Sequence, residues 1–377
     1  MTIRLGVPKE ISPGERRCAM DPAVAARLAK EGLEVCIQRG AGAGAHIPDA
    51  AYQAVRVVDD AAALYGECEL ILKVQPPTPE EVGQMREGGV VIGFMMAHQH
   101  PDMVAALLKK RITSFGMELI PRISRAQSMD ALSSQAAVAG YKAGIMGADL
   151  CNRFFPMLTT AAGTIRPSRV LVIGAGVAGL QAIATARRLG AIVEAYDVRP
   201  ETKEQVESLG AKFLELSVKA TGKGGYAREL TEDEKRQQRE ELAGFISGAD
   251  VLISTAAVPG RPAPKIVTRA MVEGMKAGAV IVDLAAESGG NCELTRPGET
   301  IEHGEVVIHA PLNVPSQLAY HATEMYAKNL FNFLHPLLKE GRFEPDWEDE
   351  IVAGSLLTCD GEISHGPTRE LLKGDAK

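Results

Sequence analysis

The stretch Val170-Leu-Val-Ile-Gly174-Ala-Gly176-Val-Ala-Gly179-Leu-Gln-Ala-Ile-Ala-Thr-Ala-Arg187 is the most informative segment of this 377-residue chain. A buried strand runs through a glycine-rich turn into a helix, and the G-x-G-x-x-G spacing is typical of dinucleotide sites. Gly174 permits the tight turn, Gly176 lets the backbone approach a pyrophosphate, and Gly179 lets the helix pack on the strand. The pyrophosphate would meet the helix N-terminus, where N–H groups and the helix dipole favour negative charge.

The next predicted strand, Ala191-Ile-Val-Glu-Ala-Tyr-Asp197, ends in an acid at about the expected interval of ~20 residues. The Asp197 carboxylate can accept both adenosine ribose hydroxyls and would repel a 2′-phosphate, so the sequence favours NAD(H) over NADP(H). Arg199 instead favours NADP(H), because an arginine can accommodate that phosphate. A second glycine cluster, Gly40-Ala-Gly42-Ala-Gly44, lacks the third-glycine spacing and is interpreted as a structural turn.

Short β-rich runs alternate with helical patterns on both sides of this stretch, which predicts parallel sheets covered by helices. We expect the α/β class, with two Rossmann-like doubly wound parallel-sheet domains separated by a cleft and joined by long helices. The predicted strands are 3–7, 34–38, 56–58, 69–74, 90–95 and 113–118 in the first domain, and 170–173, 192–196, 212–216, 251–255, 280–284 and 306–310 in the second.

Two long helices set the predicted domain boundaries. Residues 129–154 are Ala- and Gly-rich with helical spacing and look like a linking helix. A helical run at 316–338 has no strand partner in the second domain, so we expect it to cross back onto the first. The predicted domains are therefore 1–132 plus 314–377, and 133–313. The last thirty residues, rich in Asp, Glu and Gly, are expected to form a surface tail with a short amphipathic helix.

Composition excludes several classes of function. Basic residues (41) are outnumbered by acidic ones (48) and are scattered, which argues against binding nucleic acid or an anionic membrane surface. The long uncharged stretch 170–186 is broken by glycines and is too short to span a bilayer, so direct membrane insertion is not expected. Six cysteines without a C-x-x-C pair are interpreted as buried thiols of a reducing compartment. With no secretory signal at the N-terminus, the expected location is cytoplasmic.

Two loops carry candidate functional residues. Residues 217–230 exceed the usual loop length of roughly 2–6 residues and contain several glycines, so they are either a mobile lid bearing Tyr226 or a flexible loop. Residues 119–134 carry Arg122, Gln127, Asp130 and Ser133, side chains of the types that hold a carboxamide and ribose hydroxyls. Asp130 is also suited to cap the linking helix. His98 and His100 form an H-x-H pair, which we interpret as a solvated helix start, and no metal site is predicted.

Several motifs resemble one family over essentially the whole chain. They are Gly6-Val-Pro-Lys-Glu, Glu15-Arg-Arg, Ile71-Leu-Lys73-Val, the glycine-rich stretch at 170–179 and Pro259-Gly-Arg-Pro-Ala-Pro264. This family joins the alanine dehydrogenases with the α subunit of proton-translocating nicotinamide nucleotide transhydrogenase. The segment 121–135 resembles the Arg-Gln-Asp loop of the transhydrogenase, which reaches the nicotinamide end of the cofactor, and Gly224-Gly-Tyr226-Ala resembles its mobile loop.

The resemblance assigns roles to individual residues. Those placed at the nicotinamide as catalytic residues are Arg122, Gln127, Asp130, Ser133 and Tyr226. Those implied to bind NAD(H) are Gly174, Ala175, Gly176, Val177, Gly179, Asp197, Val198, Arg199, Gly225, Gln238 and Ala257.

Departures from the dehydrogenase branch favour the transhydrogenase branch. The histidine that the dehydrogenases use as acid and base corresponds to Met96, and their catalytic aspartate corresponds to Glu287, whereas Arg17 and Lys73 match their substrate-binding positions. An amino-acid dehydrogenase must move a proton as well as a hydride. Hydride exchange between two nicotinamides needs only approach and orientation of the rings.

The resemblance thus implies the NAD(H)-binding component of a transhydrogenase in its split form, because no membrane helices follow before Lys377. The implied partners are membrane-spanning subunits, including a β subunit that holds NADP(H), together with a second copy of the chain. The assembly would lie on the cytoplasmic face of the membrane. Two alternatives remain open: an alanine-dehydrogenase-like enzyme and a non-catalytic NAD(H)-sensing module.

Overall fold

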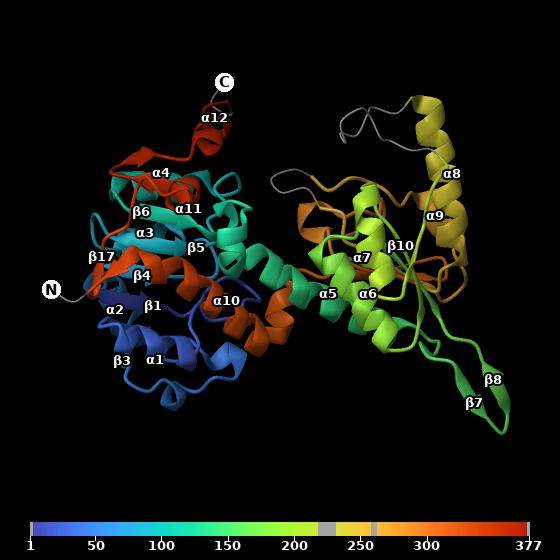
Figure 1. The fold of residues 1–377 in the computed structure, drawn as a ribbon, viewed down its shortest axis with the longest axis horizontal. Coiled ribbons are helices and arrows are strands. Elements are labelled where there is room, and N and C mark those ends of the chain that lie inside the picture. The colour runs from blue at the N-terminus through green and yellow to red at the C-terminus, as the bar shows by residue number, and fades with distance from the viewer. Residues whose placement is uncertain (1–2, 218–230, 258–261, 375–377) are drawn as a thin grey trace. The chain divides into compact units, whose positions relative to one another are not determined.

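The computed structural model describes residues 3–217, 231–257 and 262–374. The chain divides into two compact units: unit 1 comprises Met1–Gln135 and Pro315–Lys377, and unit 2 comprises Ala136–Val314. Figure 1 shows the blue N-terminal and red C-terminal segments together in unit 1. The division after Gln135 falls inside the long helix α5 (Ala131–Leu150).

Unit 1 is built on a sheet whose described strands follow the order β19-β18-β6-β5-β4-β1-β2-β3. Strands β1 to β6 pair in parallel, while β18 and β19 are antiparallel additions at one edge. The strands are β1 (Arg4–Val7), β2 (Glu34–Gln38), β3 (Arg56–Val58), β4 (Leu70–Leu72), β5 (Val90–Gly93), β6 (Thr113–Gly116), β18 (Leu356–Cys359) and β19 (Glu362–Ile363), with a separate hairpin of β16 (Leu338–Lys339) and β17 (Arg342–Phe343).

Helices cover both faces of this sheet, which is why its strands read as nearly continuous apolar runs. Leu5 of β1 packs with Tyr326 and Leu334 of α10 on one face, and Ile71 of β4 packs with Leu64 of α2 on the other. The helices of unit 1 are α1 (Pro22–Lys30), α2 (Ala61–Glu67), α3 (Pro79–Gln84), α4 (Pro101–Lys109), α10 (Ala319–Leu334), α11 (Glu350–Ser355) and α12 (Gly366–Gly374).

The expected C-terminal surface tail is wrong for the strands β18 and β19, whereas the short helix expected there is present as α12. Strand β18 pairs with β6, Leu357 and Thr358 are fully buried, and Thr358 Oγ1 lies 2.6 Å from Ser114 Oγ. The short run Leu356-Leu-Thr-Cys359 has strand character, but the Asp, Glu and Gly residues around it dominate the composition of the segment.

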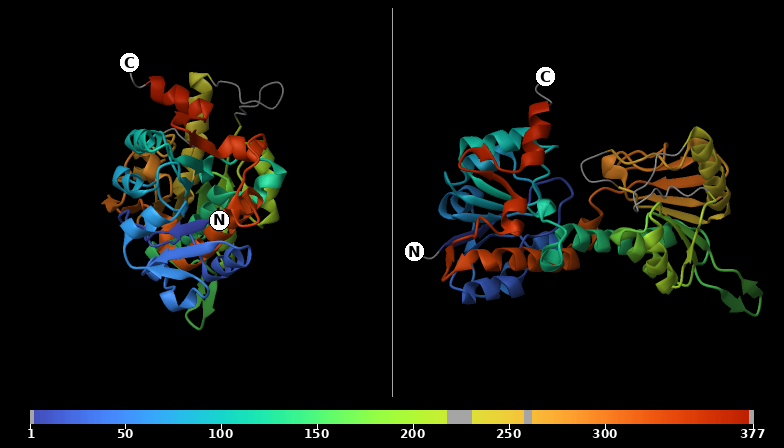
Figure 2. Two further views of the ribbon diagram at one scale, coloured as in Figure 1. Left: turned by 90° about the vertical axis from the view of Figure 1, so that its left-hand side faces the viewer. Right: turned by 45° about the horizontal axis from the view of Figure 1, so that its top comes forward.

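The sheet of unit 2 has the order β11-β10-β9-β12-β13-β15-β14 and is parallel except for the edge strand β14, which the sequence did not reveal. A small hairpin, β7–β8, was also not predicted; Figures 1 and 2 show it extending from the body of its own unit. The strands are β7 (Leu158–Thr160), β8 (Gly163–Ile165), β9 (Arg169–Ile173), β10 (Ile192–Tyr196), β11 (Lys212–Phe213), β12 (Val251–Ser254), β13 (Val280–Asp283), β14 (Thr300–His303) and β15 (Val306–His309), and the helices are α6 (Val177–Arg188), α7 (Lys203–Ser208), α8 (Glu232–Gly248) and α9 (Arg269–Glu273).

Both sheets are thus dominated by parallel strands with helices on their faces, which confirms the predicted fold class. Strand order reverses at β9 in unit 2 and at β1 in unit 1. Ligands of such sheets bind where neighbouring strands diverge, beyond their carboxyl ends. Within the described ranges, no helix is both long enough and apolar enough to cross a membrane.

Candidate functional site

The glycine-rich turn after β9 lies at the point where the strand order of unit 2 reverses. Gly174 adopts φ 94°, and a Cβ there would lie 2.6 Å from Thr255 Oγ1. A Cβ on Gly179 would lie 1.8 Å from the Gly174 carbonyl oxygen, so only glycine permits this approach of α6 to the turn. A Cβ on Gly176 would meet no atom within 4 Å, which leaves open space beside the backbone there. Close packing thus leaves no room for a side chain at Gly174 or Gly179, whereas Gly176 between them faces open space.

Helix α6 starts at this opening, and no side chain caps its N-terminus. Its N-cap, Gly176, contributes no side-chain hydrogen bond, and its first turn carries no acidic residue. Arg187 and Arg188 complement the dipole at the opposite end. Ala175 is buried and Gly176 has no side chain, so backbone is accessible at this point, next to Val177, which is 43% exposed. This donor set fits a pyrophosphate.

Asp197 follows β10 and is 9% exposed. Its carboxylate accepts hydrogen bonds from the backbone N–H of Ala175 at 2.7 Å and from Nε and Nη2 of Arg199 at 2.9 Å each. Burial by itself would raise the pKa of Asp197, but the Arg199 guanidinium and these N–H groups hold it below its usual value. Asp197 therefore stays ionised, and Arg199 is turned onto it. The neighbouring Val198 is 70% exposed.

The remaining predicted residues of unit 2 are placed as follows. Gln238 of α8 donates a hydrogen bond to the Tyr196 hydroxyl at 3.1 Å, and Ala257 is exposed beyond the end of β12. Gly225 and Tyr226 lie outside the described residues, as does the predicted lid. Glu287 is exposed and accepts a hydrogen bond from the backbone N–H of Asn313 at 2.6 Å.

Asn291 fixes the backbone after β12 through its carboxamide. The sequence analysis did not identify this residue. Its carboxamide accepts from the Ala256 N–H at 3.0 Å and donates to the carbonyl oxygens of Ala256 at 2.7 Å and Pro264 at 2.9 Å. It thereby joins the two ends of the segment that carries Ala257. The signal available in the sequence was an amide directly after Gly289-Gly290, both of which adopt positive φ.

In unit 1, the segment from Arg122 to Ser133 combines exposed side chains with a fixed backbone. Arg122 and Gln127 are exposed, whereas Asp130 and Ser133 are half-buried. Asp130 caps α5 by accepting from the Ser133 N–H at 2.8 Å and from its hydroxyl at 2.6 Å. The carbonyl oxygen of Ser128 accepts hydrogen bonds from two amides of α10, Asn329 and Asn332, at 3.0 Å each.

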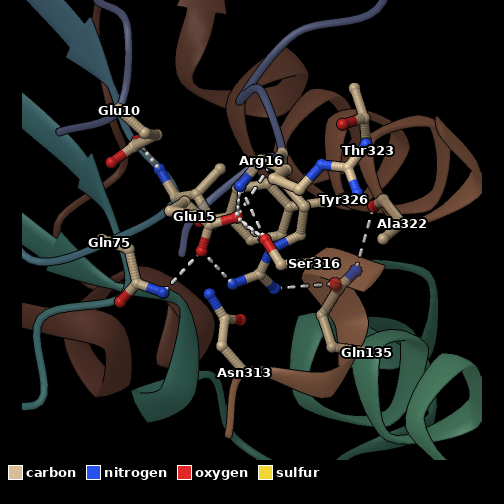
Figure 3. Close-up of polar contacts among 12 residues, drawn as sticks. Glu10, Glu15, Arg16, Gln75, Gln135, Asn313, Ser316, Ala322, Thr323 and Tyr326 are labelled. Carbon is tan, nitrogen blue, oxygen red and sulfur yellow. Dashed lines mark hydrogen bonds and ion pairs between the residues drawn. The ribbon is translucent and has the colours of Figure 1, made fainter. Parts of the chain in front are cut away.

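A buried ionic cluster lies at the carboxyl ends of β1 and β4, where the strand order of unit 1 reverses. Figure 3 shows the Glu15 carboxylate between Gln75 and Ser316, with Gln135 nearby. Arg17, 5% exposed, donates from Nε and Nη2 to the two oxygens of Glu15 at 2.8 and 2.6 Å and from Nη1 to Gln135 at 2.8 Å. Burial alone would raise the pKa of Glu15, but its hydrogen bonds and its ion pair with Arg17 lower it to about 2.

Lys73 forms the second half of this cluster. Its ammonium group, 1% exposed, lies 2.8 Å from Glu81 and 3.3 Å from Glu10. Burial would lower the pKa of Lys73, but the two carboxylates raise it, so the lysine stays charged. Burial raises the pKa of Glu10 against the pull of Lys73. Both cations are thus paired with carboxylates of the chain itself: Glu15 and Glu10 belong to the motifs Glu15–Arg17 and Gly6–Glu10, and Glu81 belongs to α3.

Met96 follows β5 of the unit 1 sheet, in a backbone conformation that is strained for a residue other than glycine. It adopts φ 42°, and its N–H donates to Glu118 at 2.7 Å. His98 and His100 are exposed, and α4 begins directly after them at Pro101, as predicted. No group of three His, Cys, Asp or Glu side chains that could hold a metal occurs among the residues that the structure describes.

Comparison with known proteins gives two family models that together match most of the chain. The model described as "Alanine dehydrogenase/PNT, N-terminal domain" matches residues 6–139, and "Alanine dehydrogenase/PNT, C-terminal domain" matches residues 143–366. The chain is 46% identical over 376 residues to the first part of NAD(P) transhydrogenase subunit alpha of Rhodospirillum rubrum, covering 96% of this chain and 98% of that protein.

Two further relatives represent both branches. The crystal structure of transhydrogenase from Sinorhizobium meliloti superposes with a TM-score of 0.86 at 42% identity, covering 97% of this chain and 99% of that one. An alanine dehydrogenase of Mycobacterium tuberculosis is 31% identical over 377 residues, covering 96% of this chain and 94% of that protein. Similarity is higher on the transhydrogenase side.

Proposed function

Since this chain belongs to the alanine dehydrogenase/PNT family, we propose that it is the NAD(H)-binding component of a proton-translocating transhydrogenase. It would pass a hydride from NADH directly to NADP⁺ held on a partner β subunit, while membrane-spanning subunits move the proton. The observation that carries this proposal is the open turn at Gly176, with α6 behind it and the ionised Asp197 beside it.

Each half of the site has a distinct task in this proposal. Gly174, Gly176 and Gly179 shape the turn so that backbone N–H groups meet the pyrophosphate, and Asp197 accepts the ribose hydroxyls. Arg122, Gln127, Asp130 and Ser133 orient the carboxamide and ribose at the nicotinamide end, and Tyr226 closes over it. The dihydronicotinamide supplies the hydride when bound, so the chain's residues need only position and desolvate it.

Pairing between Asp197 and Arg199 supports NAD(H) rather than NADP(H) as the ligand of this chain. A 2′-phosphate would have to displace the carboxylate from the guanidinium, and it would then face a buried negative charge. NADP(H) is therefore assigned to the partner.

The second candidate is an alanine-dehydrogenase-like enzyme. It is favoured by the buried cations Arg17 and Lys73 at the strand ends of unit 1. Against it, Met96 offers no group that could transfer a proton at the position of the dehydrogenase histidine. A third candidate, an NAD(H) sensor, needs the same dinucleotide site without any hydride acceptor.

We propose that the chain acts as a homodimer, bound peripherally to the cytoplasmic face of the membrane through its partners. The hairpin β7–β8 supports the dimer, because it extends from unit 2 with apolar side chains in solvent: Ile165 is 47% exposed and Met157, just before β7, is 64% exposed. Apolar side chains held out on a two-stranded hairpin are typical of contacts with another chain.

A reconstituted hydride assay tests the proposal. The chain is mixed with a purified NADP(H)-binding transhydrogenase component, and reduction of an NAD⁺ analogue by NADPH is followed by absorbance. We expect turnover that requires both proteins. The same chain with NADH, pyruvate and ammonia should give none.

Each outcome selects one candidate. Turnover with pyruvate and ammonia would identify the dehydrogenase. NADH binding without any stimulation by the partner would identify the sensor. Absence of NADH binding would contradict the dinucleotide site itself.

A further inference from the structure

Two buried cysteines lie on one face of the unit 1 sheet. Cys36 lies on β2, and Cys68 directly follows α2. Gly6 of β1 is the register partner of Cys36, and a Cβ on Gly6 would lie 2.9 Å from Cys68 Sγ. Since neighbouring strands lie about 4.8 Å apart, Cys68 Sγ sits beside the side chain of Cys36. Both cysteines are at most 1% exposed and belong to the same buried cluster.

A partly exposed arginine contacts this pair. Arg56 of β3 is the register partner of Cys36, and its Nη2 lies 3.3 Å from Cys36 Sγ. The Arg56 side chain is 42% exposed and also pairs with Glu67 of α2. The neighbouring Cys68 thiol lowers the pKa of Cys36, and the Arg56 guanidinium lowers it further against the effect of burial, to about 7. The proximity of Cys36 and burial raise the pKa of Cys68.

We propose that Cys36 and Cys68 form a reversible disulfide on exposure to a peroxide, with Cys36 as the attacking thiolate and Cys68 as the resolving thiol. Cys36 Sγ attacks one peroxide oxygen, the O–O bond breaks, and the leaving hydroxide is protonated to water. Cys68 Sγ then attacks the resulting sulfenic sulfur, the S–O bond breaks, and the departing hydroxide takes the Cys68 proton. Two thiols lose two electrons, and hydrogen peroxide becomes two waters.

The other described cysteines lack this combination. Burial raises the pKa of Cys18 to about 11 and also raises that of Cys292. Cys359, the most accessible of the cysteines, has its Sγ 3.9 Å from the carboxylate of Asp360 rather than beside a second thiol or a cation. The proposal rests on unit 1 alone and does not depend on nucleotide binding.

Peroxide titration of the 377-residue chain tests it. The reduced chain is treated with hydrogen peroxide, denatured, alkylated and mapped by peptide mass spectrometry. We expect a linked Cys36–Cys68 peptide, loss of two alkylatable thiols, and recovery of both with dithiothreitol. In Cys68→Ser, dimedone should trap a sulfenic acid at Cys36, and Cys359→Ser should behave like the wild type.

Arg56→Gln should slow the oxidation of Cys36 about fivefold at pH 7, because the thiolate loses its cation. Arg39→Gln is the matched control, since Arg39 pairs only with Asp49 and Asp59 among the described contacts and meets no thiol. Survival of all thiols, oxidation of Cys359 before Cys36, or equal slowing by both arginine variants would overturn the proposal. The wild-type peptide map decides the question even if a variant folds poorly.

Discussion

The charge of Glu15 depends on two opposing effects on its pKa: burial raises it, and the ion pair and hydrogen bonds lower it. Its pKa of about 2 lies below the usual 4.5, so its ion pair with Arg17 stabilises the fold fully above about pH 4.5, and this contribution is lost as pH falls toward 2. The shift corresponds to about 3 kcal/mol for a fully buried carboxylate.

We therefore expect Glu15→Gln to lower the free energy of unfolding at pH 7 and to flatten its dependence on pH between 4.5 and 3. Urea unfolding at each pH measures both effects. Glu344→Gln is the control, because that carboxylate is exposed. Parallel wild-type and Glu15→Gln curves would show that the ion pair contributes nothing.

In the proposed function, Asp197 selects the dinucleotide that the turn accepts. Asp197→Asn removes the charge that repels a 2′-phosphate and releases Arg199. We expect NADH to bind about tenfold more weakly, because a charged acceptor is lost, and NADPH to bind more tightly. Fluorescence titration with both nucleotides measures the change. An unaltered preference would show that Asp197 only holds the Ala175 backbone.

At the scale of elements, Asp130 both caps α5 and belongs to the residues proposed to orient the nicotinamide. Asp130→Asn keeps an acceptor for the Ser133 N–H and so preserves the cap, but it removes the charge. We expect hydride exchange to slow by at least tenfold while the NADH dissociation constant changes less than twofold. Ser133→Ala is the companion variant, since it removes only the hydroxyl. Equal losses in exchange and binding would mean that the segment merely holds the nucleotide.

At the scale of the whole molecule, the hairpin β7–β8 predicts self-association. Ile165→Asp should shift the chain from dimer to monomer by light scattering, because a charge would be buried at the interface. Ile11→Asp is matched to it, since Ile11 is an exposed isoleucine of unit 1, whereas the hairpin belongs to unit 2. A monomeric wild type, or dissociation by both variants, would contradict the assignment of the interface to this hairpin.

Much of this architecture was predictable because it depends on local patterns. The turn at 174–179, the strand ending at Tyr196 and the start of α4 at Pro101 each follow from glycine, acid or proline at fixed spacing. Element ends were less predictable: the strand predicted at 212–216 is formed only by Lys212–Phe213. Strand length depends on what the neighbouring strand offers, and the sequence does not encode that locally.

Residue patterns alone were sufficient for the α/β class, the dinucleotide turn and the acid at its side, because each is a short-range pattern with its own steric or electrostatic cause. Three-dimensional packing was needed to show that Arg199 is turned onto Asp197, that the buried cations Arg17 and Lys73 are paired with carboxylates of the chain, and that β18 completes the sheet of unit 1. All three depend on burial, where an unpaired charge or backbone group costs too much to persist.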